Sequence, residues 1–209
     1  MRDEYTLNSE IAALWPDVSG NSINGLDQAD PARPRPVFWR EDGSTPHGPV
    51  MFYFYERYKD NANIAAARKY RQRTAVEPDS GVAPEAEHRL PDDWTASIKA
   101  AALEMGADDV GICLYDPEWS FADRPVPQGK WAIVMAFEHA YDNLSAAPDD
   151  ATYIEIMRQY GRAGLSAKKL ANWIKDRGHF AAPKTGPMTE DVLMIPAAIQ
   201  AGLGELGKH

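Results

Sequence analysis

The sequence predicts an α/β or α+β fold in which helices cover a small sheet. Two stretches of strand length, 110–115 and 131–137, are almost wholly apolar, and a long amphipathic helix pattern follows over about 152–177. The 209 residues, 44% of them hydrophobic, are sufficient for one buried core. We expect residues 90–209 to form this layered core, and residues 1–89 to form an irregular N-terminal arm and a linker.

The first 50 residues are polar and rich in proline. The run Pro-Ala-Arg-Pro-Arg-Pro at 31–36 favours an extended, partly polyproline arm, with a simple long loop as the alternative. Residues 51–55, Met-Phe-Tyr-Phe-Tyr, are too apolar to remain in water, so we expect a strand or the anchor of the arm there. A helix is predicted from about Asn61 to Arg73, and the acidic, proline-containing stretch 77–90 is typical of a linker.

The core begins with a predicted helix after Leu90. Asp92 or Asp93 is expected to cap this helix, and Gly106 is expected to end it. Its apolar positions fall on one face: Trp94, Ile98, Ala101, Ala102 and Met105.

Two strands are predicted next, at 110–115 and, after a proline-rich loop, at 131–137. Because almost every position of the second strand is apolar, we expect it to be buried on both faces. The long helix over about 152–177 follows, with Gly178 as its stop, and 179–183 offers a third short strand. The inward positions of the long helix are Ile154, Met157, Leu165, Leu170, Trp173 and Ile174.

The charge balance argues against several classes of partner. The net charge is -9, and no basic run outweighs the acidic background, so we expect neither a nucleic-acid surface nor an anionic membrane surface. The best basic cluster, formed by Arg68, Lys69, Arg71 and Arg73, is interpreted as a solvated helix face. No apolar run approaches the roughly 18 residues of a membrane span, and neither an apolar signal core nor a twin-arginine export pattern is present, so a cytoplasmic protein is expected.

The chain contains one cysteine, Cys113. A single thiol excludes an internal disulfide and any multi-cysteine metal site built from this chain alone. Because Cys113 lies in the apolar run Val-Gly-Ile-Cys-Leu, we interpret it as a small buried hydrophobic residue and not as a nucleophile. No metal ligand is predicted in the chain.

The first candidate site is the glycine-rich C-terminal stretch. Thr189 or Asp191 is expected to open a last helix that runs toward Ala201, and Gly-Leu-Gly-Glu-Leu-Gly follows at 202–207. Because this pattern follows a helix and not a strand, it is not a dinucleotide-binding fingerprint. Closely spaced glycines let main-chain amides approach a bulky ligand, and a helix C-cap followed by a loop is the plainer interpretation.

Lys208 and His209 end the sequence, where they offer a cation and a proton carrier, or are simply solvated. A glycine-rich site at a chain end also leads us to expect that these residues are part of a larger catalytic unit.

The second candidate site directly follows the second strand. Glu138, His139 and Tyr141 lie there, and in open α/β sheets ligands bind at the carboxyl ends of the strands. Tyr141 has the chemistry to donate a proton, and His139 to orient it or to bind a ligand. Tyr153 and Tyr160 are interpreted as packing residues whose hydroxyls find partners. No catalytic-triad motif, His-Glu-x-x-His motif or phosphate loop is present.

These residues carry a resemblance to a known family. The run Tyr-Gly-Arg-Ala-Gly-Leu-Ser-Ala-Lys-Lys-Leu-Ala-Asn-Trp-Ile-Lys-Asp-Arg-Gly at 160–178, the Gly-Pro-Met at 186–188, and 195–209 ending in Ala-Gly-Leu-Gly-Glu-Leu-Gly-Lys-His resemble the cobalamin-dependent reductive dehalogenases. The segment 106–112 and the second strand fit the same family. The chain is also similar, more distantly, to the epoxyqueuosine reductases.

The resemblance implies a nitroreductase-like core that binds base-off cobalamin, beside a module with two 4Fe-4S clusters. In that family the cluster cysteines lie downstream of the Gly-Lys-His motif, and this chain contains none there. We therefore expect part of a longer protein, or a second chain that supplies the iron-sulfur module, and no activity from these residues alone. The long arm fits the cytoplasmic, respiration-independent type. The implied partners are a small organohalide, with an aromatic one expected, and an electron donor such as a ferredoxin or a reductase.

The family also implies roles for single residues. Tyr141 is assigned as the proton donor and Lys208 as the cation that favours its phenolate, with Tyr153 and Tyr160 as alternative donors. The corrinoid-binding set is Gly202, Leu203, Gly204, Glu205, Leu206, Gly207, His209 and His139.

One departure separates the two related families. The epoxyqueuosine branch has an aspartate before the proline that precedes the last helix, whereas this chain has Lys-Thr-Gly before Pro187, which favours the dehalogenase branch. An epoxyqueuosine reductase-like enzyme and a non-catalytic corrinoid-binding module remain the alternatives.

Overall fold

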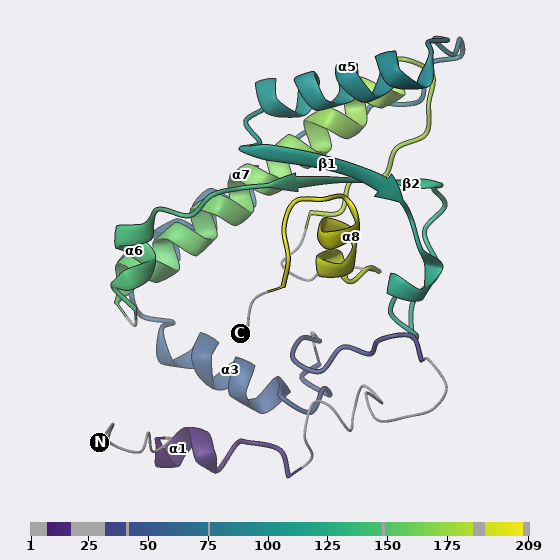
Figure 1. The fold of residues 1–209 in the computed structure, drawn as a ribbon. Helices are drawn as coiled ribbons and strands as arrows, with labels where there is room; N and C mark the ends of the chain where they lie inside the picture. The colour runs from purple at the N-terminus through teal and green to yellow at the C-terminus, as the bar shows by residue number, and fades with distance from the viewer. Residues whose placement is uncertain are drawn as a thin grey trace.

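The computed structural model describes residues 8–17, 32–40, 42–74, 76–147, 149–185 and 191–206. Within these residues one small sheet is enclosed by helices, as Figure 1 shows. In chain order the elements are α1 (Ser9–Ala12), α3 (Gly48–Arg57), α4 (Ala62–Thr74), α5 (Pro91–Glu104), β1 (Asp109–Leu114), the short 3-10 helix η1 (Pro117–Trp119), β2 (Trp131–Ala136), α6 (Tyr141–Ser145), α7 (Asp150–Lys175) and α8 (Met194–Gln200).

The two predicted strands pair with each other in an antiparallel sheet. Asp109 lies opposite Ala136 at one end and Leu114 lies opposite Trp131 at the other. Mixed helices with a small antiparallel sheet make this an α+β arrangement, which confirms the predicted fold class at that level.

The sheet is the middle of three layers, with α5 and α7 on one side and α8 on the other (Figure 1). Successive strand residues point to opposite faces. Val110 therefore packs against α5 and α7, while Gly111 and Cys113 face α8. A Cβ on Gly111 would lie 2.6 Å from the carbonyl oxygen of Ala201, so the absence of a side chain there allows α8 to approach β1. The Cys113 thiol donates to the Ala197 carbonyl at 3.6 Å.

The main hydrophobic core lies between α5, α7 and the sheet. Its buried members are Ala101, Ala102, Ala107, Val110, Leu170 and Ile174. Helix α5 begins at Pro91 with Leu90 as its N-cap, so the prediction of an Asp92 or Asp93 cap was wrong. Proline at the first helical position presets its backbone angle and lacks an N–H that needs capping, and the two aspartates in the first turn complement the helix dipole instead.

Strand β2 is only partly buried, in contrast to the predicted burial on both faces. Trp131 is exposed, and the remaining five residues of the strand are half-buried. Ile133 and Met135 pack only partly against the core formed with α5 and α7, and on the opposite face of the sheet the covering helix α8 spans only seven residues.

The predicted third strand at 179–183 is also wrong, since no strand forms there in the described residues. The backbone N–H of His179 donates to the carbonyl of Ile174 and completes the end of α7. The ring of His179 forms a hydrogen bond with the carbonyl of Glu87 at 2.8 Å. The segment is therefore hydrogen-bonded to the end of α7 and to the linker, and it does not pair with a strand.

The linker lies against the C-terminal end of α7. The N–H groups of Ala83 and Glu87 donate to the carbonyls of Lys175 and Arg177, both at 2.9 Å. The predicted linker therefore has no helix or strand of its own, as expected, yet is hydrogen-bonded to the core.

The arm also packs on α7. Residues 51–55 lie inside α3, so the predicted strand was wrong. Met51 is buried, as an anchor requires, whereas Phe52 and Phe54 are exposed, contrary to the expectation that this run is withdrawn from water. Helix α4 confirms the predicted helix, and it buries Ile64 and Ala67 against Tyr153 and Met157 of α7.

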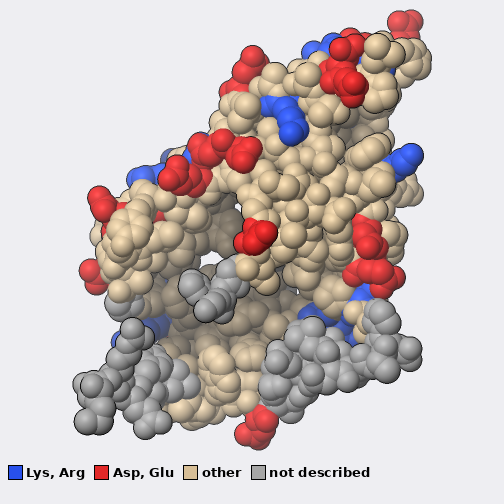
Figure 2. Space-filling view, viewed as in Figure 1, with Lys and Arg blue, Asp and Glu red and all other residues tan. Residues whose placement is uncertain are grey.

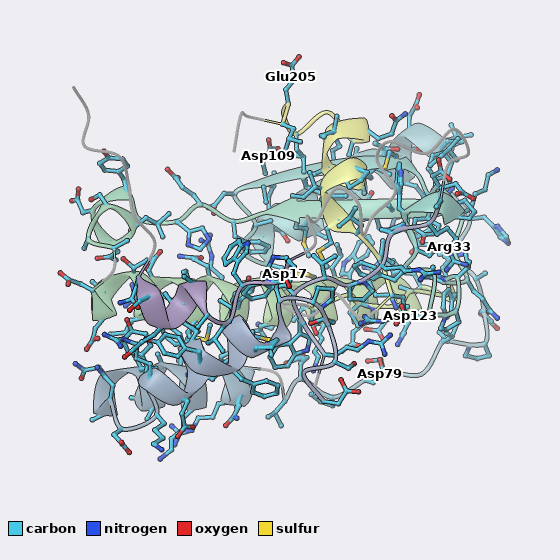
Figure 3. All side chains as sticks on the ribbon, turned by 90° about the horizontal axis from the view of Figure 1, so that it is seen from below. Asp17, Arg33, Asp79, Asp109, Asp123 and Glu205 are labelled. Atoms are coloured by element: carbon cyan, nitrogen blue, oxygen red, sulfur yellow. The ribbon has the colours of Figure 1, made fainter. Side chains whose placement is uncertain are left out.

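Arg33 fixes the proline-rich arm to the loop before β2. Its guanidinium donates to the carbonyls of Ser120, Phe121 and Arg124. Figure 3 shows Arg33 at the same end of the molecule as Asp123, which pairs with Arg40.

Helix α8 begins later than predicted. Thr189 lies outside the described residues, and Asp191 precedes the helix instead of opening it. The carbonyl of Asp191 accepts from the N–H of Phe121 at 2.9 Å, and the N–H of Leu193 donates to Trp119 at 2.8 Å. This pairing holds Val192 in an antiparallel bridge with Ser120, so helical bonding starts at Met194. None of the helices in the described ranges has the length and apolar character needed to cross a membrane.

Candidate functional site

The glycine-rich loop leaves α8 through a glycine cap. The N–H of Gly202 donates to the carbonyl of Ile199 at 3.0 Å, and the N–H of Leu203 donates to Ala198 at 3.1 Å. With a φ of 78° at Gly202, this is the Schellman pattern that ends many helices. The C-cap interpretation is therefore confirmed for Gly202, and the loop follows a helix, as predicted.

Beyond the cap the loop faces open space. Gly202, Gly204, Glu205 and Leu206 are exposed, and Leu203 is half-buried. A Cβ placed on Gly202 or Gly204 would meet no described atom within 4 Å. Figure 3 shows the Glu205 side chain pointing away from the body of the molecule. Gly207, Lys208 and His209 lie outside the described residues.

The molecule is hollowed next to this loop. Figure 2 shows a depression between the side that carries α6 and the body formed by the sheet and α8. In Figure 1, α6, α3 and the C-terminal loop surround the same region.

The second predicted site also follows β2, although the argument that led to it does not apply. The rule on carboxyl ends concerns open parallel sheets, whereas the described strands are antiparallel. Tyr141 is the first residue of α6 and is 81% exposed, without a hydrogen-bond partner for its hydroxyl among the described residues. His139 is half-buried, and its Nδ1 is buried without a partner in the described part of the chain.

Two carboxylates hold the backbone on either side of His139. The N–H of Glu138 donates to Asp108 Oδ2 at 2.7 Å, and the N–H of Ala140 donates to Glu155 Oε1 at 2.9 Å. Asp108 also accepts from Arg162 Nη2 at 2.8 Å. The hydrogen bond from Arg162, followed by that from the Glu138 amide, lowers the pKa of Asp108.

Sequence reasoning missed Glu155, which is 1% exposed. The Ala140 amide first, and then Gln159, Asn143 and Arg158, lower the pKa of Glu155 against the opposing effect of burial. A carboxylate on the inward face of an amphipathic helix was the available signal, because an unpaired charge does not stay buried. This signal indicates that Glu155 needs a hydrogen-bonding partner, but it does not identify that partner.

Glu155 belongs to a polar stripe along α7 that contacts loop backbone. Farther along the helix, Arg162 Nη2 donates to the carbonyl of Gly106 and Ser166 Oγ donates to that of Met105, both at 2.6 Å. Residues four and three positions apart lie on one face of a helix, so Glu155, Gln159, Arg162 and Ser166 form one row. This row ties the end of α5 and the end of β2 to α7.

The alternative tyrosines lie on the side of α7 that faces α4. Tyr153 is 8% exposed, and its hydroxyl accepts from Arg68 Nε at 2.8 Å, so it packs and finds a partner as expected. Tyr160 is more exposed, and Arg71 lies 5.8 Å from its ring.

The predicted solvated face of α4 is only partly confirmed. Lys69 and Arg73 are exposed, whereas Arg68 is half-buried between two tyrosine rings. Arg68 lies 4.9 Å from the ring of Tyr55, and burial raises the pKa of that tyrosine.

Cys113 is buried, as predicted, and burial raises the pKa of its thiol. Across the described ranges no three histidine, cysteine or acidic side chains are grouped as metal ligands.

The chain is similar to known proteins over only part of its length. No family model matches the chain. Over 107 residues, or 50% of the chain, it is 29% identical to a tetrachloroethene reductive dehalogenase of Dehalobacter restrictus. Over the same length it is 28% identical to a tetrachloroethene reductive dehalogenase of Desulfitobacterium hafniense. The match spans only 18% of each of these relatives. The similarity supports a protein related to the reductive dehalogenases, which are oxidoreductases.

Proposed function

We propose that this chain is part of a cobalamin-dependent reductive dehalogenase that removes halide from an aromatic organohalide. Similarity to two tetrachloroethene reductive dehalogenases supports the reaction class. The structural observation that carries the proposal is the exposed loop after α8, where Gly202 and Gly204 leave space for a bulky ligand against the main chain. We assign residues 90–209 as a nitroreductase-like corrinoid-binding domain of the cytoplasmic, respiration-independent type.

The described residues fit a base-off corrinoid in two respects. The loop from Gly202 to Leu206 is open to a large, flat ligand, and the buried His139 Nδ1 has no hydrogen-bond partner among the described residues. Gly207 and His209 complete the proposed binding set. A bound corrinoid would supply the reductive, cobalt-centred cleavage of the carbon–halogen bond. The chain's own residues would orient the cofactor and deliver a proton.

The iron-sulfur clusters do not fit this chain. Four-iron clusters are held by cysteine thiolates, and the only cysteine, Cys113, is buried with its pKa raised. The ligands for two clusters, and the contact with a ferredoxin or reductase donor, would come from residues outside this chain.

Tyr141 is the proposed proton donor, and Lys208 is the proposed cation beside it. An adjacent positive charge favours the phenolate that remains after proton transfer. The exposure of Tyr141 leaves its hydroxyl accessible to a substrate. Tyr153 and Tyr160 are the alternative proton donors. Arg68 donates a hydrogen bond to the Tyr153 hydroxyl, and Arg71 lies over the Tyr160 ring.

The test uses the full-length protein that contains this chain. Anaerobic reconstitution with cobalamin should give the absorption spectrum of a base-off corrinoid. The reconstituted protein should then release halide from a haloaromatic substrate under reducing conditions. A protein that binds no corrinoid contradicts the proposal. A tRNA-binding titration at several salt concentrations serves as the control for an epoxyqueuosine reductase-like function, and we expect no specific binding.

A further inference from the structure

The backbone that carries His139 is fixed from both sides. Glu138, His139 and Ala140 lie between β2 and α6, and Tyr141 begins α6; these four residues are here called the His139 segment. The two N–H groups that flank His139 donate to carboxylates, at 2.7 Å for Glu138 and 2.9 Å for Ala140. The Ala140 bond fixes the peptide plane that follows His139, and the Glu138 bond fixes the plane between Phe137 and Glu138, so the backbone is restrained on both sides of His139.

Both carboxylates are linked to each other along α7. Gln159 Nε2 donates to Glu155 Oε1 at 2.8 Å, and Gln159 Oε1 accepts from Arg162 Nη1 at 3.3 Å. Arg162 in turn pairs with Asp108 at 2.8 Å. A continuous row of hydrogen bonds therefore runs from Glu155 to Asp108 and ends at both flanking amides.

The chemistry at position 155 requires a carboxylate. The other partners of Glu155 besides the Ala140 amide are Asn143 Nδ2 at 3.2 Å, Arg158 Nη1 at 3.3 Å and Gln159 Nε2. Every partner is a donor, and an ionised carboxylate only accepts. Glutamine at this position would keep the shape but turn an NH2 group toward donors, leaving buried groups unpaired.

Asn143 extends the same attachment into α6. Its side chain donates to Glu155, and its carbonyl accepts from Thr152 Oγ1 at 2.8 Å. Because Tyr141 is the first residue of α6, fixing this short helix also fixes where the Tyr141 side chain begins.

We propose that Glu155 and Asp108 are positioning residues, which hold the His139 segment so that the His139 ring stays in place and the exposed Tyr141 hydroxyl is presented to the ligand. Neither carboxylate touches the ligand itself. The identity of that ligand rests on the function proposed above, whereas the restraint on the backbone does not.

The restraint is tested by hydrogen exchange of the backbone amides. In Glu155→Gln the Ala140 amide should exchange about tenfold faster or more, because one neutral oxygen replaces a carboxylate that accepts from four donors, and the bond to the amide is weakened. Ser166→Ala is the matched control, because Ser166 is a buried polar residue of the same row that contacts Met105 and not the His139 segment. Unchanged exchange at Ala140 in Glu155→Gln overturns the proposal.

Asp108→Ala is the second variant, chosen because the Asp108 side chain is 40% exposed and its removal leaves the core in place. It should raise the exchange rate of the Glu138 amide to a similar extent. If Glu155→Gln does not fold, Asp108→Ala is the remaining test of the restraint, and an unchanged exchange rate of the Glu138 amide overturns the proposal.

The link to function is tested in the corrinoid-loaded full-length protein. Glu155→Gln and Asp108→Ala should lower kcat by about tenfold to a hundredfold with little change in KM, since displaced catalytic groups slow turnover more than binding. Ser166→Ala should keep its kcat. If wild-type protein binds corrinoid but releases no halide, the proposed function is contradicted. The restraint on the backbone is then judged from hydrogen exchange alone. Variants with normal exchange and normal kcat overturn the positioning role.

Discussion

At the scale of single residues, the most informative side chain is a buried acid. Glu155 is charged inside the protein because its donors replace water around the carboxylate. The backbone amide of Ala140 contributes most to lowering its pKa. The residue therefore links the stability of α7 to the backbone of the candidate site.

This linkage predicts a pH dependence of stability. The pKa of Glu155 is lower in the folded than in the unfolded chain, where it is near 4.5. The unfolded state then binds more protons at acid pH, so the stabilisation is fully present above about pH 4.5 and is lost as the pH falls through the folded pKa. Urea unfolding between neutral and acid pH should show a shallower acid loss in Glu155→Gln than in wild type.

The control for this experiment is Glu205→Gln, since Glu205 is exposed and points away from the body. It should leave the wild-type acid slope unchanged. An acid slope in Glu155→Gln that equals that of wild type would contradict the linkage.

The three tyrosines give a second prediction at this scale. Tyr141→Phe should abolish dehalogenation while corrinoid stays bound, because only the donated proton is removed. Tyr153→Phe should lower the free energy of unfolding by about 1 kcal/mol, since the hydroxyl that accepts from Arg68 is lost. Halide release and corrinoid absorbance measure the effect of Tyr141→Phe, and urea unfolding measures that of Tyr153→Phe. Normal turnover in Tyr141→Phe would shift the donor role to Tyr153 or Tyr160.

At the scale of elements, three helices end in the same way. Gly106, Gly178 and Gly202 follow α5, α7 and α8 with φ values of 98°, 75° and 78°. Only glycine adopts this region without a steric cost, so each helix stops where the sequence places a glycine. The ends differ in their surroundings, because the linker crosses Gly178 whereas Gly202 faces open space.

That difference predicts unequal effects of the same substitution. Gly202→Ala should cost about 1 kcal/mol of stability, the penalty of a left-handed alanine. Gly178→Ala should cost clearly more, because its Cβ would lie 2.3 Å from the backbone oxygen of Glu85 and 2.5 Å from Ala86 Cα. Urea unfolding of the two variants measures the contrast, and equal losses would show that the linker moves away freely.

At the scale of the whole molecule, the N-terminal arm and the core share buried contacts. Helix α4 packs on α7 through a cluster that contains Ile64 and Met157. Arg33 attaches the proline-rich part to the loop before β2. The division into an arm of residues 1–89 and a domain of residues 90–209 stays a prediction, but these contacts indicate that the two stabilise each other.

Cooperative unfolding tests this mutual stabilisation. Ile64 is 1% exposed, so Ile64→Ala should cost about 2–5 kcal/mol through lost burial and the cavity that remains. Signals from arm and core tryptophans, Trp39 and Trp173, should still fall in a single transition. Lys69→Ala, an exposed change on the same helix, should have little effect. An early transition confined to Trp39 would show that the arm unfolds by itself.

Local patterns in the sequence were enough to predict much of this fold. Apolar runs placed both strands, helical spacing placed α4, α5 and α7, and glycines marked where helices end, because each of these signals depends on neighbouring residues. Burial of Cys113 followed from its apolar surroundings. The glycine-rich ending and the family resemblance were also readable there, and the comparisons support that resemblance at the level of a related reductive dehalogenase.

Other features were decided only by tertiary structure, since they depend on contacts between distant segments. Residues 51–55 became helical against α7, and pairing with the loop after η1 delayed the start of α8. The hydrogen bonds from the His139 segment to Glu155 and Asp108 were likewise not predictable from local sequence, because both carboxylates are distant from the segment in the chain. Local sequence indicated that Glu155 needed donors, and only the fold determined that one of them is the amide beside His139.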